Sequence, residues 1–288
     1  MTKRVLGRYG NRHTHWVGDG FPVRSLFSYQ EHGIAVSPFL LLDFVGPHSF
    51  SPSTGKPGVG QHPHRGFETV SIVFDGEVEH KDSAGHGGVI GPGDVQWMTA
   101  GAGIIHEEYH SPGFVRRGGR MNMVQLWVNL PAAEKMASPA YQGITAAEIP
   151  IAELNGGSGV VRIIAGEFNG IRGPARTFTP VNVWDLRLVA GKSQKLSLPE
   201  GHTAMVVVVE GQLIIEDTRI NDAEMVMLSR DGSDLTLRAN DASTVLVLSG
   251  EPIDEPIAGY GPFVMNSAEE IHQAIADFNS GRFARHGI

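Results

Sequence analysis

Residues 62–76 read HPHRGFETVSIVFDG, and this stretch combines strand-forming residues with a turn signal. Its apolar part, Val70–Phe74, is rich in β-branched residues and ends at an Asp-Gly dipeptide, which is typical of tight hairpin turns. Two similar apolar runs, Val95–Met98 and Val124–Val128, follow at short spacing with Gly and Pro between them. Short strands with this punctuation predict a β-sandwich or β-barrel over about residues 21–128.

A weak internal repeat extends this β pattern into the second half of the chain. Val206–Val209, followed by Glu-Gly, resembles Ile72–Phe74, followed by Asp-Gly, about 135 residues earlier. Further on, Ala223–Met227 resembles Gly93–Trp97 at a separation of about 130 residues. Two copies of one unit that differ in the length of a loop explain both separations. We therefore expect an all-β chain with two tandem barrels or sandwiches.

The expected domain organisation follows from the two copies of the repeat and from the composition of the segment between them. Residues 1–131 are predicted to form the first domain and residues 160–262 the second, with residues 132–159 as a connection rich in Ala, Glu, Pro and Gly. Residues 263–288 form a tail in which Ser267–Glu270 fits a capping box. The apolar residues that follow at helical spacing are Ile271, Ala274, Ile275 and Phe278. One amphipathic helix that packs against the barrels is expected there.

The composition excludes several classes of function. The 288 residues include no cysteine, which rules out disulfides, thiolate zinc sites, iron–sulfur clusters and cysteine nucleophiles. The formal net charge of −8 argues against broad electrostatic binding to nucleic acid or to anionic membranes. No signal peptide is visible, and the longest apolar run, Ala204–Val209, is far shorter than the roughly 20 residues of a membrane helix. We therefore expect a cytoplasmic protein that binds neither membranes nor nucleic acid directly.

Two pairs of polar residues have the spacing of ligands on neighbouring strands. His62 and His64 are two residues apart, and residues at this spacing point to the same side of an extended chain. His106 and Glu108 have the same spacing. If the two strands lie side by side, three imidazoles and one carboxylate converge. This ligand set suits Fe(II), Mn(II), Co(II), Ni(II), Cu(II) or Zn(II), and an octahedral ion would keep two positions open.

The same spacing also occurs where no second pair is near. His13 and His15 lie in a polar segment without a neighbouring His/Glu pair, so we interpret them as surface or structural residues. Spacing alone therefore leaves a structural role open for His62 and His64 as well.

Longer stretches of the sequence resemble the pirin family. The similar motifs are residues 62–71 (HPHRGFETVS), 92–101 (PGDVQWMTAG) and 103–108 (GIIHEE), with further pirin-like text at residues 18–24, 37–40, 126–130 and 261–266. The resemblance spans essentially the whole chain. It implies a bicupin, in which two tandem cupin β-barrels of jelly-roll type are followed by a C-terminal helix. It also implies one metal in the N-terminal barrel, and the ligands carried over are His62, His64, His106 and Glu108.

Three further polar residues near the motifs have weaker roles in this comparison. Glu68 occupies a position where many cupins carry a ligand, but in pirins the Glu after the second motif's His replaces it. We therefore expect Glu68 beside the site, where it would orient a ligand imidazole, or as a plain hairpin charge. Glu107 alternates to the face opposite Glu108, and His110 is expected at most at the rim of the site.

The repeat extends the comparison to the second domain. The positions that correspond to His62, His64, Glu68, His106 and Glu108 are Ser197, Pro199, Thr203, Thr236 and Arg238. This set offers no His or carboxylate ligand, so a single metal in the first domain is expected. His202 lies near these positions and is interpreted as a solvated loop histidine.

The resemblance implies a dioxygenase similar to quercetinase. Such an enzyme opens the central ring of a flavonol with O2 and releases carbon monoxide, and Fe(II) is the first expectation for the metal, which acts as Lewis acid and template. Glu108, as the one carboxylate ligand, is the candidate catalytic residue that accepts the proton of the 3-hydroxyl group. Candidate wall residues, each equally suited to the barrel core, are Phe44, Phe67, Met98, Gln125 and Trp127.

Other functions remain open at this point. Eukaryotic pirins resemble metal- or redox-dependent regulatory proteins that act through a protein partner without turnover, and that role needs a basic patch. Arg116, Arg117 and Arg120 form the one notable basic cluster, which a solvated loop also explains. Another enol as the natural substrate is a further alternative. A monomer is expected.

Overall fold

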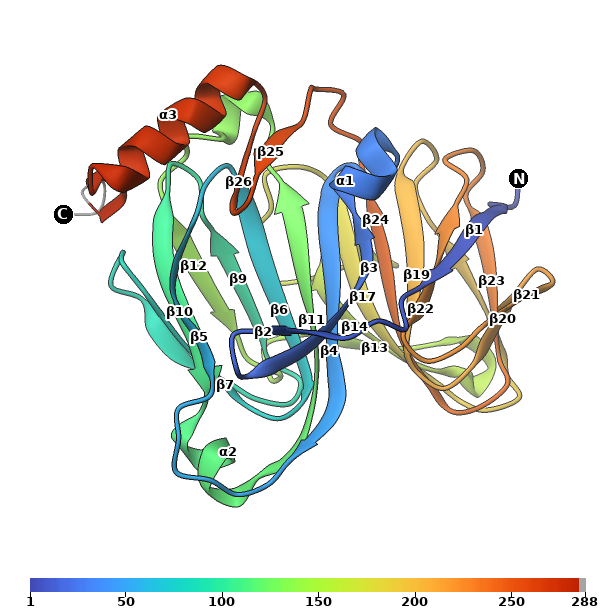
Figure 1. The fold of residues 1–288 in the computed structure, drawn as a ribbon. Helices are drawn as coiled ribbons and strands as arrows, with labels where there is room; N and C mark the ends of the chain where they lie inside the picture. The colour runs from blue at the N-terminus through green and yellow to red at the C-terminus, as the bar shows by residue number, and fades with distance from the viewer. Residues whose placement is uncertain (285–288) are drawn as a thin grey trace. The chain divides into compact units, whose positions relative to one another are not determined.

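A computed structural model describes residues 1–284 of the chain, so the last four residues of the expected tail lie outside the described residues. Contacts divide the chain into two compact units, which we call the N-terminal unit and the C-terminal unit (Figure 1). Of the described residues, the N-terminal unit comprises His13–Ile34, Phe39–Ala146 and residues 253–284, and the C-terminal unit comprises Met1–Arg12, Ala35–Pro38 and Ala147–Pro252. Both units are built mainly from antiparallel strands.

The N-terminal unit contains a seven-stranded and a four-stranded sheet. In spatial order, the larger sheet consists of β12 (Ala140–Ile144), β9 (Val95–Thr99), β6 (Phe67–Asp75), β11 (Gly119–Asn129), β4 (Phe39–Phe50), β3 (Phe21–Ser28) and β2 (His15–Val17). The smaller sheet consists of β5 (Gly58–His64), β10 (Ile104–His110), β7 (Val78–Asp82) and β8 (Gly87–Ile90). The short helices are α1 (Tyr29–His32) and α2 (Pro112–Arg117).

The C-terminal unit repeats this pair of sheets. Its larger sheet consists of β1 (Val5–Gly10), β22 (Glu224–Leu228), β19 (Thr203–Glu210), β24 (Ser243–Gly250), β17 (Val181–Leu188), β14 (Gly159–Ala165) and β13 (Ile151–Glu153). Its smaller sheet consists of β18 (Ser193–Ser197), β23 (Asp234–Ala239), β20 (Leu213–Ile215) and β21 (Thr218–Ile220). A two-stranded ribbon is formed by β15 (Glu167–Phe168) and β16 (Ile171–Arg172). The expected all-β fold with two tandem barrels is therefore confirmed.

The units are assembled from segments that are distant in the sequence. β1 pairs with β22, so residues 1–12 belong to the C-terminal unit and not to the N-terminal domain expected for residues 1–131. β12 pairs with β9, which places part of the expected connection, residues 132–159, in the N-terminal unit. Composition reports local structure and cannot show such long-range pairings, so the division by contacts differs from the division expected from composition.

The C-terminal tail carries the expected helix, α3 (Ala268–Asn279). Ser267 caps it in a complete capping box, because its hydroxyl accepts the backbone N–H of Glu270 and the Glu270 carboxylate accepts the backbone N–H of Ser267. Figure 1 shows α3 beside the hairpin of β25 (Ala258–Tyr260) and β26 (Phe263–Met265). The buried residues of this packing are Phe263, Met265, Ile271, Ala274 and Phe283. Within residues 1–284, none of the helices has the length and apolar character needed to cross a membrane.

Strand register brings the polar motifs of the N-terminal unit together. β10 lies between β5 and β7, and His106 pairs directly with His62 on one side and with Asp82 on the other. Glu108 pairs with His80 of β7. In the larger sheet, Gln96 and Gln125 both pair with Ser71, so these two amides lie on the same face.

Candidate metal centre

Three of the predicted ligands form a compact group at the strand pair β5–β10. The ligand nitrogens of His62, His64 and His106 all lie within 4.8 Å of one another. The ring centroids of His62 and His106 are 4.2 Å apart, and His64 lies 4.9 Å from each of them. His64 and His106 are buried, whereas His62 is partly exposed.

Glu108 belongs to a second group, which shares His106 with the first and contains His80, a residue that the sequence did not predict. His80, His106 and Glu108 also have ligand atoms within 4.8 Å of one another, and all three are buried. We refer to His62, His64, His80, His106 and Glu108 as the His–Glu cluster. The turn expected at Asp75-Gly76 does not form a hairpin, because β6 and β7 lie in different sheets. His80 reaches the cluster through the pairing of β7 with β10, which no local signal in the sequence shows.

The surroundings of His64 and His106 favour the neutral form of these two imidazoles. Burial, with a further contribution from His62, lowers the pKa of His64 to about 3. Burial also lowers the pKa of His106 well below its usual value, and the neighbouring imidazoles of His64, His62 and His80 lower it further. Neutral imidazoles are the form that binds a transition metal.

Two nitrogens of these histidines are buried without a partner. Nδ1 of His64 and Nε2 of His106 have no hydrogen bond from the described residues. Leaving a buried polar atom unpaired is unfavourable, so such atoms usually indicate an unseen water or ion. Together with the carboxylate of Glu108, these lone pairs fit a divalent cation bound by imidazole and carboxylate.

Two glutamine side chains hold the carboxylate of Glu108. Gln96 Nε2 donates to Oε1 at 3.3 Å, and Gln125 Nε2 donates to Oε2 at 3.1 Å. Gln96 Nε2 also lies 3.2 Å from Nδ1 of His80. Since both oxygens are engaged by residues of the larger sheet, the orientation of the carboxylate depends on β9 and β11 as well as on its own strand.

His80 is held by a second network behind the cluster. Its Nε2 lies 3.4 Å from Oδ2 of Asp82, and Nδ1 of His86 lies 3.2 Å from the same oxygen. Although burial opposes it, hydrogen bonds from His80 and from the backbone of His86 lower the pKa of Asp82. The ring of Tyr141 stacks on both imidazoles, at 5.1 Å from His80 and 5.8 Å from His86. This network fixes the ring plane of His80.

The other polar residues near the motifs lie outside the cluster. Glu68 pairs with Thr99, and its Oε1 accepts a hydrogen bond from the Thr99 hydroxyl at 2.7 Å. Glu68 therefore lies on the face of the sheet opposite Ser71 and Gln96. The interpretation of Glu68 as a residue that orients a ligand imidazole is therefore wrong. His110 is buried and bonds through Nε2 to the carbonyl of Gly20 at 2.8 Å, so it is not a rim residue.

A cavity opens beside the cluster, and we call it the cluster cavity. It is lined by Val17, Phe21, Val23, Asp43, Val45, Val59, His62, Glu108, Met123 and Gln125. Its volume is about 50 Å³, and most of the wall is apolar. Of the five expected wall residues, Gln125 lines it, whereas Phe67 and Trp127 pack beside His64 with centroid distances of 5.2 and 5.5 Å. Phe44 and Met98 are fully buried and do not line this cavity.

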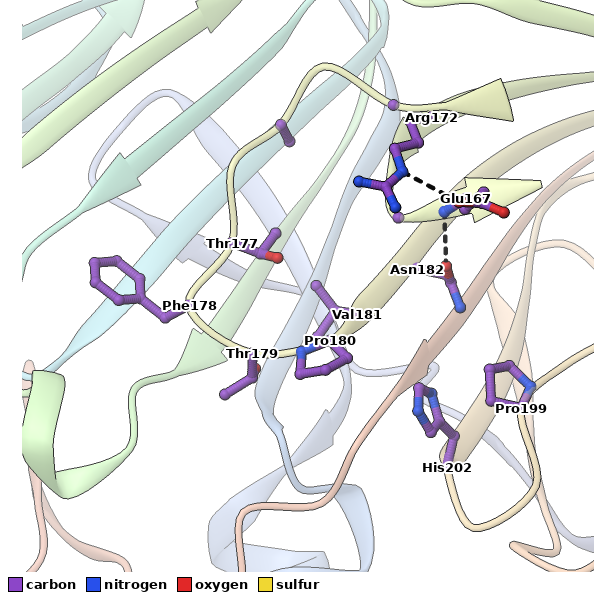
Figure 2. A pocket seen from close by; sticks show the side chains of 13 residues that line it. Glu167, Arg172, Thr177, Phe178, Thr179, Pro180, Val181, Asn182, Pro199 and His202 are labelled. Atoms are coloured by element: carbon purple, nitrogen blue, oxygen red, sulfur yellow. Dashed lines mark hydrogen bonds and ion pairs between the residues drawn. The ribbon is translucent and has the colours of Figure 1, made fainter. Parts of the chain in front are cut away.

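The C-terminal unit contains a cavity of a different kind. Figure 2 shows His202, Asn182 and Arg172 around it, and the Nδ1 atom of His202 is buried without a partner among the described residues. His202 lies in the loop before β19, as expected, but it is partly buried, and burial lowers its pKa. The corresponding positions Ser197 and Thr236 lie on the paired strands β18 and β23. Among residues 1–284, the groupings of three potential metal ligands occur only in the N-terminal unit.

Known proteins share this sequence and this fold. The pirin family model matches residues 20–128, and the model of the pirin C-terminal cupin domain matches residues 183–284. A Pseudomonas aeruginosa protein named "Putative quercetin 2,3-dioxygenase" is 59% identical over 283 residues, which cover 98% of this chain and 99% of that protein. Pirin-like protein 2 of Arabidopsis thaliana is 40% identical over 92% of this chain and 81% of its own.

A solved structure extends the similarity to the whole fold. The crystal structure of quercetin 2,3-dioxygenase from Acinetobacter baumannii has a TM-score of 0.96 and 55% identity, and the match covers 98% of this chain and 99% of that one. The bacterial pirin YhhW from Escherichia coli, solved in complex with nickel(II), shares the fold at 20% identity and a TM-score of 0.66, over 86% of this chain and 99% of its own. The chain therefore belongs to the pirin family.

Proposed function

We propose that this protein is a metal-dependent dioxygenase that opens the central ring of flavonols with O2 and releases carbon monoxide. The observation that carries the proposal is the largely buried cluster of imidazoles and one carboxylate beside a mostly apolar cavity. Relatives over nearly the full chain length bear the name quercetin 2,3-dioxygenase, which supports the same reaction class.

Four residues of the cluster are proposed to hold the metal, and they are His62, His64, His106 and Glu108. The unpaired nitrogens of His64 and His106 fit this role, since a cation would satisfy both of them. When bound, a divalent ion, with Fe(II) as our first choice, supplies Lewis-acid chemistry and a template for the reacting oxygen atoms.

The side chains around the cluster have separate tasks in this proposal. Glu108 accepts the proton of the flavonol 3-hydroxyl group, because its carboxylate lines the cluster cavity. Gln96 and Gln125 hold that carboxylate in place during the transfer. The apolar wall, with Phe21, Val45 and others, contacts the substrate ring and excludes water.

The volume of the cluster cavity limits what can enter it. A volume of about 50 Å³ is smaller than a flavonol and admits only the edge of one ring. We therefore place the oxygen-bearing edge of the substrate in the cavity and the rest of the molecule outside it. The same volume favours a second candidate substrate, a smaller enol that enters the cavity completely and gives the proton of its enol hydroxyl group to Glu108.

The test combines metal analysis with turnover on two histidine variants. Purified protein is analysed for metal, mixed with quercetin without oxygen and then aerated, in the wild type, His62→Ala and His13→Ala. We expect stoichiometric metal, ring opening and carbon monoxide release in the wild type and in His13→Ala, the control with the same His-x-His spacing. His62→Ala is expected to lose both metal and turnover.

A Glu108→Gln variant tests the proton-accepting role separately. If this variant keeps the metal and its turnover has an unchanged pH–rate profile, Glu108 does not accept the proton.

Two other outcomes would overturn the proposal. Stoichiometric metal without turnover of any flavonol would favour a metal-dependent regulatory protein that acts through a protein partner. Absence of metal even after reconstitution would exclude both functions.

A further inference from the structure

A second carboxylate lines the cluster cavity and has no task in the reaction proposed above. Asp43 lies on β4, paired with Gln125 of β11, so its side chain is on the face of the sheet that carries the amide bonded to Glu108. It lines the same cavity as His62 and Glu108. The cavity therefore has one carboxyl group within the His–Glu cluster and another outside it.

Only one of the two oxygens of the Asp43 carboxylate is hydrogen-bonded within the described residues. Ser25 pairs with Asp43 across β3 and β4, and its hydroxyl donates to Oδ1 at 2.6 Å. No hydrogen bond from the described residues reaches Oδ2. Burial raises the pKa of Asp43 above its usual value despite the opposing effects of Ser25 and the nearby His15. An acceptor atom in a largely apolar wall has few partners within the protein, so a donor group of a ligand would be bound there with a clear preference.

We propose that Asp43 is a specificity-determining residue that accepts a hydrogen bond from a second hydroxyl group of the substrate. This inference rests on the proposed function, because it assumes that the first hydroxyl group is the one directed to Glu108. A substrate with one hydroxyl group satisfies Glu108 and leaves Asp43 without a donor. A substrate with two or more hydroxyl groups donates to both Glu108 and Asp43. The site therefore selects polyhydroxylated aromatic compounds.

The experiment measures whether Asp43 and the second hydroxyl group are coupled. Metal-loaded protein is titrated without oxygen with 3-hydroxyflavone, 3,7-dihydroxyflavone and 3,5,7-trihydroxyflavone, and oxygen is then admitted to measure kcat and KM. For the wild type, an added hydroxyl group is expected to strengthen binding by about 10- to 100-fold, as for a hydrogen bond to a charged group. The member of the series at which the gain occurs identifies the hydroxyl group.

Two variants separate this role from a structural one. Asp43→Val is expected to bind all three flavonols with the affinity that the wild type has for 3-hydroxyflavone, with the metal content unchanged. Asp43→Asn keeps an acceptor oxygen and is expected to restore part of the preference. A merely structural role would weaken binding of all three compounds by the same factor.

The outcomes distinguish this inference from the proposed function. If the wild type binds and converts the flavonols but Asp43→Val keeps the wild-type preference, the role of Asp43 is overturned and the dioxygenase proposal stands. If the wild type shows the preference in anaerobic binding but no turnover, the Asp43 inference holds and the dioxygenase proposal fails. If none of the three compounds binds, both are overturned.

Discussion

Glu68 shows how far the chemistry of one residue depends on the face of its strand. Its carboxyl group is almost completely buried and bonded to the Thr99 hydroxyl, on the face opposite the His–Glu cluster. Burial raises the pKa of Glu68 to about 7, against the opposing hydrogen bond from Thr99. With a pKa of about 7, the carboxyl group of Glu68 is partly protonated at neutral pH, although it lies on the face of the sheet that the proposed reaction does not use.

This shift makes the stability of the protein depend on pH. The folded pKa lies above the ordinary value of 4.5, so between pH 4.5 and 7 the folded state binds more protons than the unfolded state. The stability that protonation of Glu68 gives to the folded state is fully present below pH 4.5. It is lost as the pH rises through 7, and the loss is at most about 3 kcal/mol. Glu68→Gln removes this decrease, and the variant is expected to gain stability relative to the wild type as the pH rises.

Denaturant midpoints of the wild type and Glu68→Gln at pH 5 and pH 8 measure the effect. Glu153→Gln, a change at an exposed position of β13, is the control and should follow the wild type at both pH values. Equal differences between Glu68→Gln and the wild type at pH 5 and pH 8 would show that Glu68 does not titrate in this range.

At the scale of elements, α3 is connected to the strand that carries two of the proposed ligands. Arg65 directly follows His64 and is buried, and its Nη1 donates to Oδ2 of Asp277 on α3 at 2.9 Å. Its Nε donates to the carbonyl of Ala102 at 2.6 Å, and the ring of Phe283 lies 4.4 Å from the guanidinium carbon. The C-terminal helix therefore holds the end of β5 through one ion pair, in which Arg65 is buried and Asp277 is partly exposed.

Loss of this ion pair is expected to be more costly than loss of the helix cap. Asp277→Ala leaves the buried guanidinium of Arg65 without its carboxylate, and we expect a loss of about 2 to 4 kcal/mol in the free energy of unfolding. Ser267→Ala removes the N-cap and should cost about 1 kcal/mol. Chemical denaturation of both variants measures the difference, and equal losses would mean that Arg65 finds another partner when Asp277 is absent.

At the scale of the whole molecule, the His–Glu cluster lies entirely within the N-terminal unit. A ligand that binds only the folded state adds stability to the unit that holds it, by about 2.7 kcal/mol at a free concentration 100 times its dissociation constant. The four tryptophans report on the units separately, because Trp184 belongs to the C-terminal unit and Trp16, Trp97 and Trp127 belong to the N-terminal unit.

Removal of the metal is therefore expected to destabilise one unit selectively. In a Trp184→Phe variant, fluorescence reports on the N-terminal unit alone, and a chelator should lower the midpoint of its thermal transition. Calorimetry of the same samples should show a second transition, from the C-terminal unit, that the chelator leaves in place. A chelator that shifts both transitions equally, or neither, would contradict this assignment.

The sequence by itself determined the fold class, the four proposed ligands and the C-terminal helix. The turn after Phe74 and the capping box at Ser267 are local signals, and each depends on residues only a few positions apart. The spacing of His62 and His64 and that of His106 and Glu108 are equally local, and the family motifs around them added the expectation that both pairs bind one metal.

Only the tertiary structure decided which other residues face the cluster. β6 is buried along most of its length on both faces, so the alternation of polar and apolar residues cannot show that Glu68 points away. His80 and Asp43 reach the cluster and its cavity through pairings of β7 with β10 and of β4 with β11, between strands that are distant in the sequence. The same long-range pairing places β1 in the C-terminal unit. Register between distant strands depends on how the whole core packs, and local spacing does not contain this information.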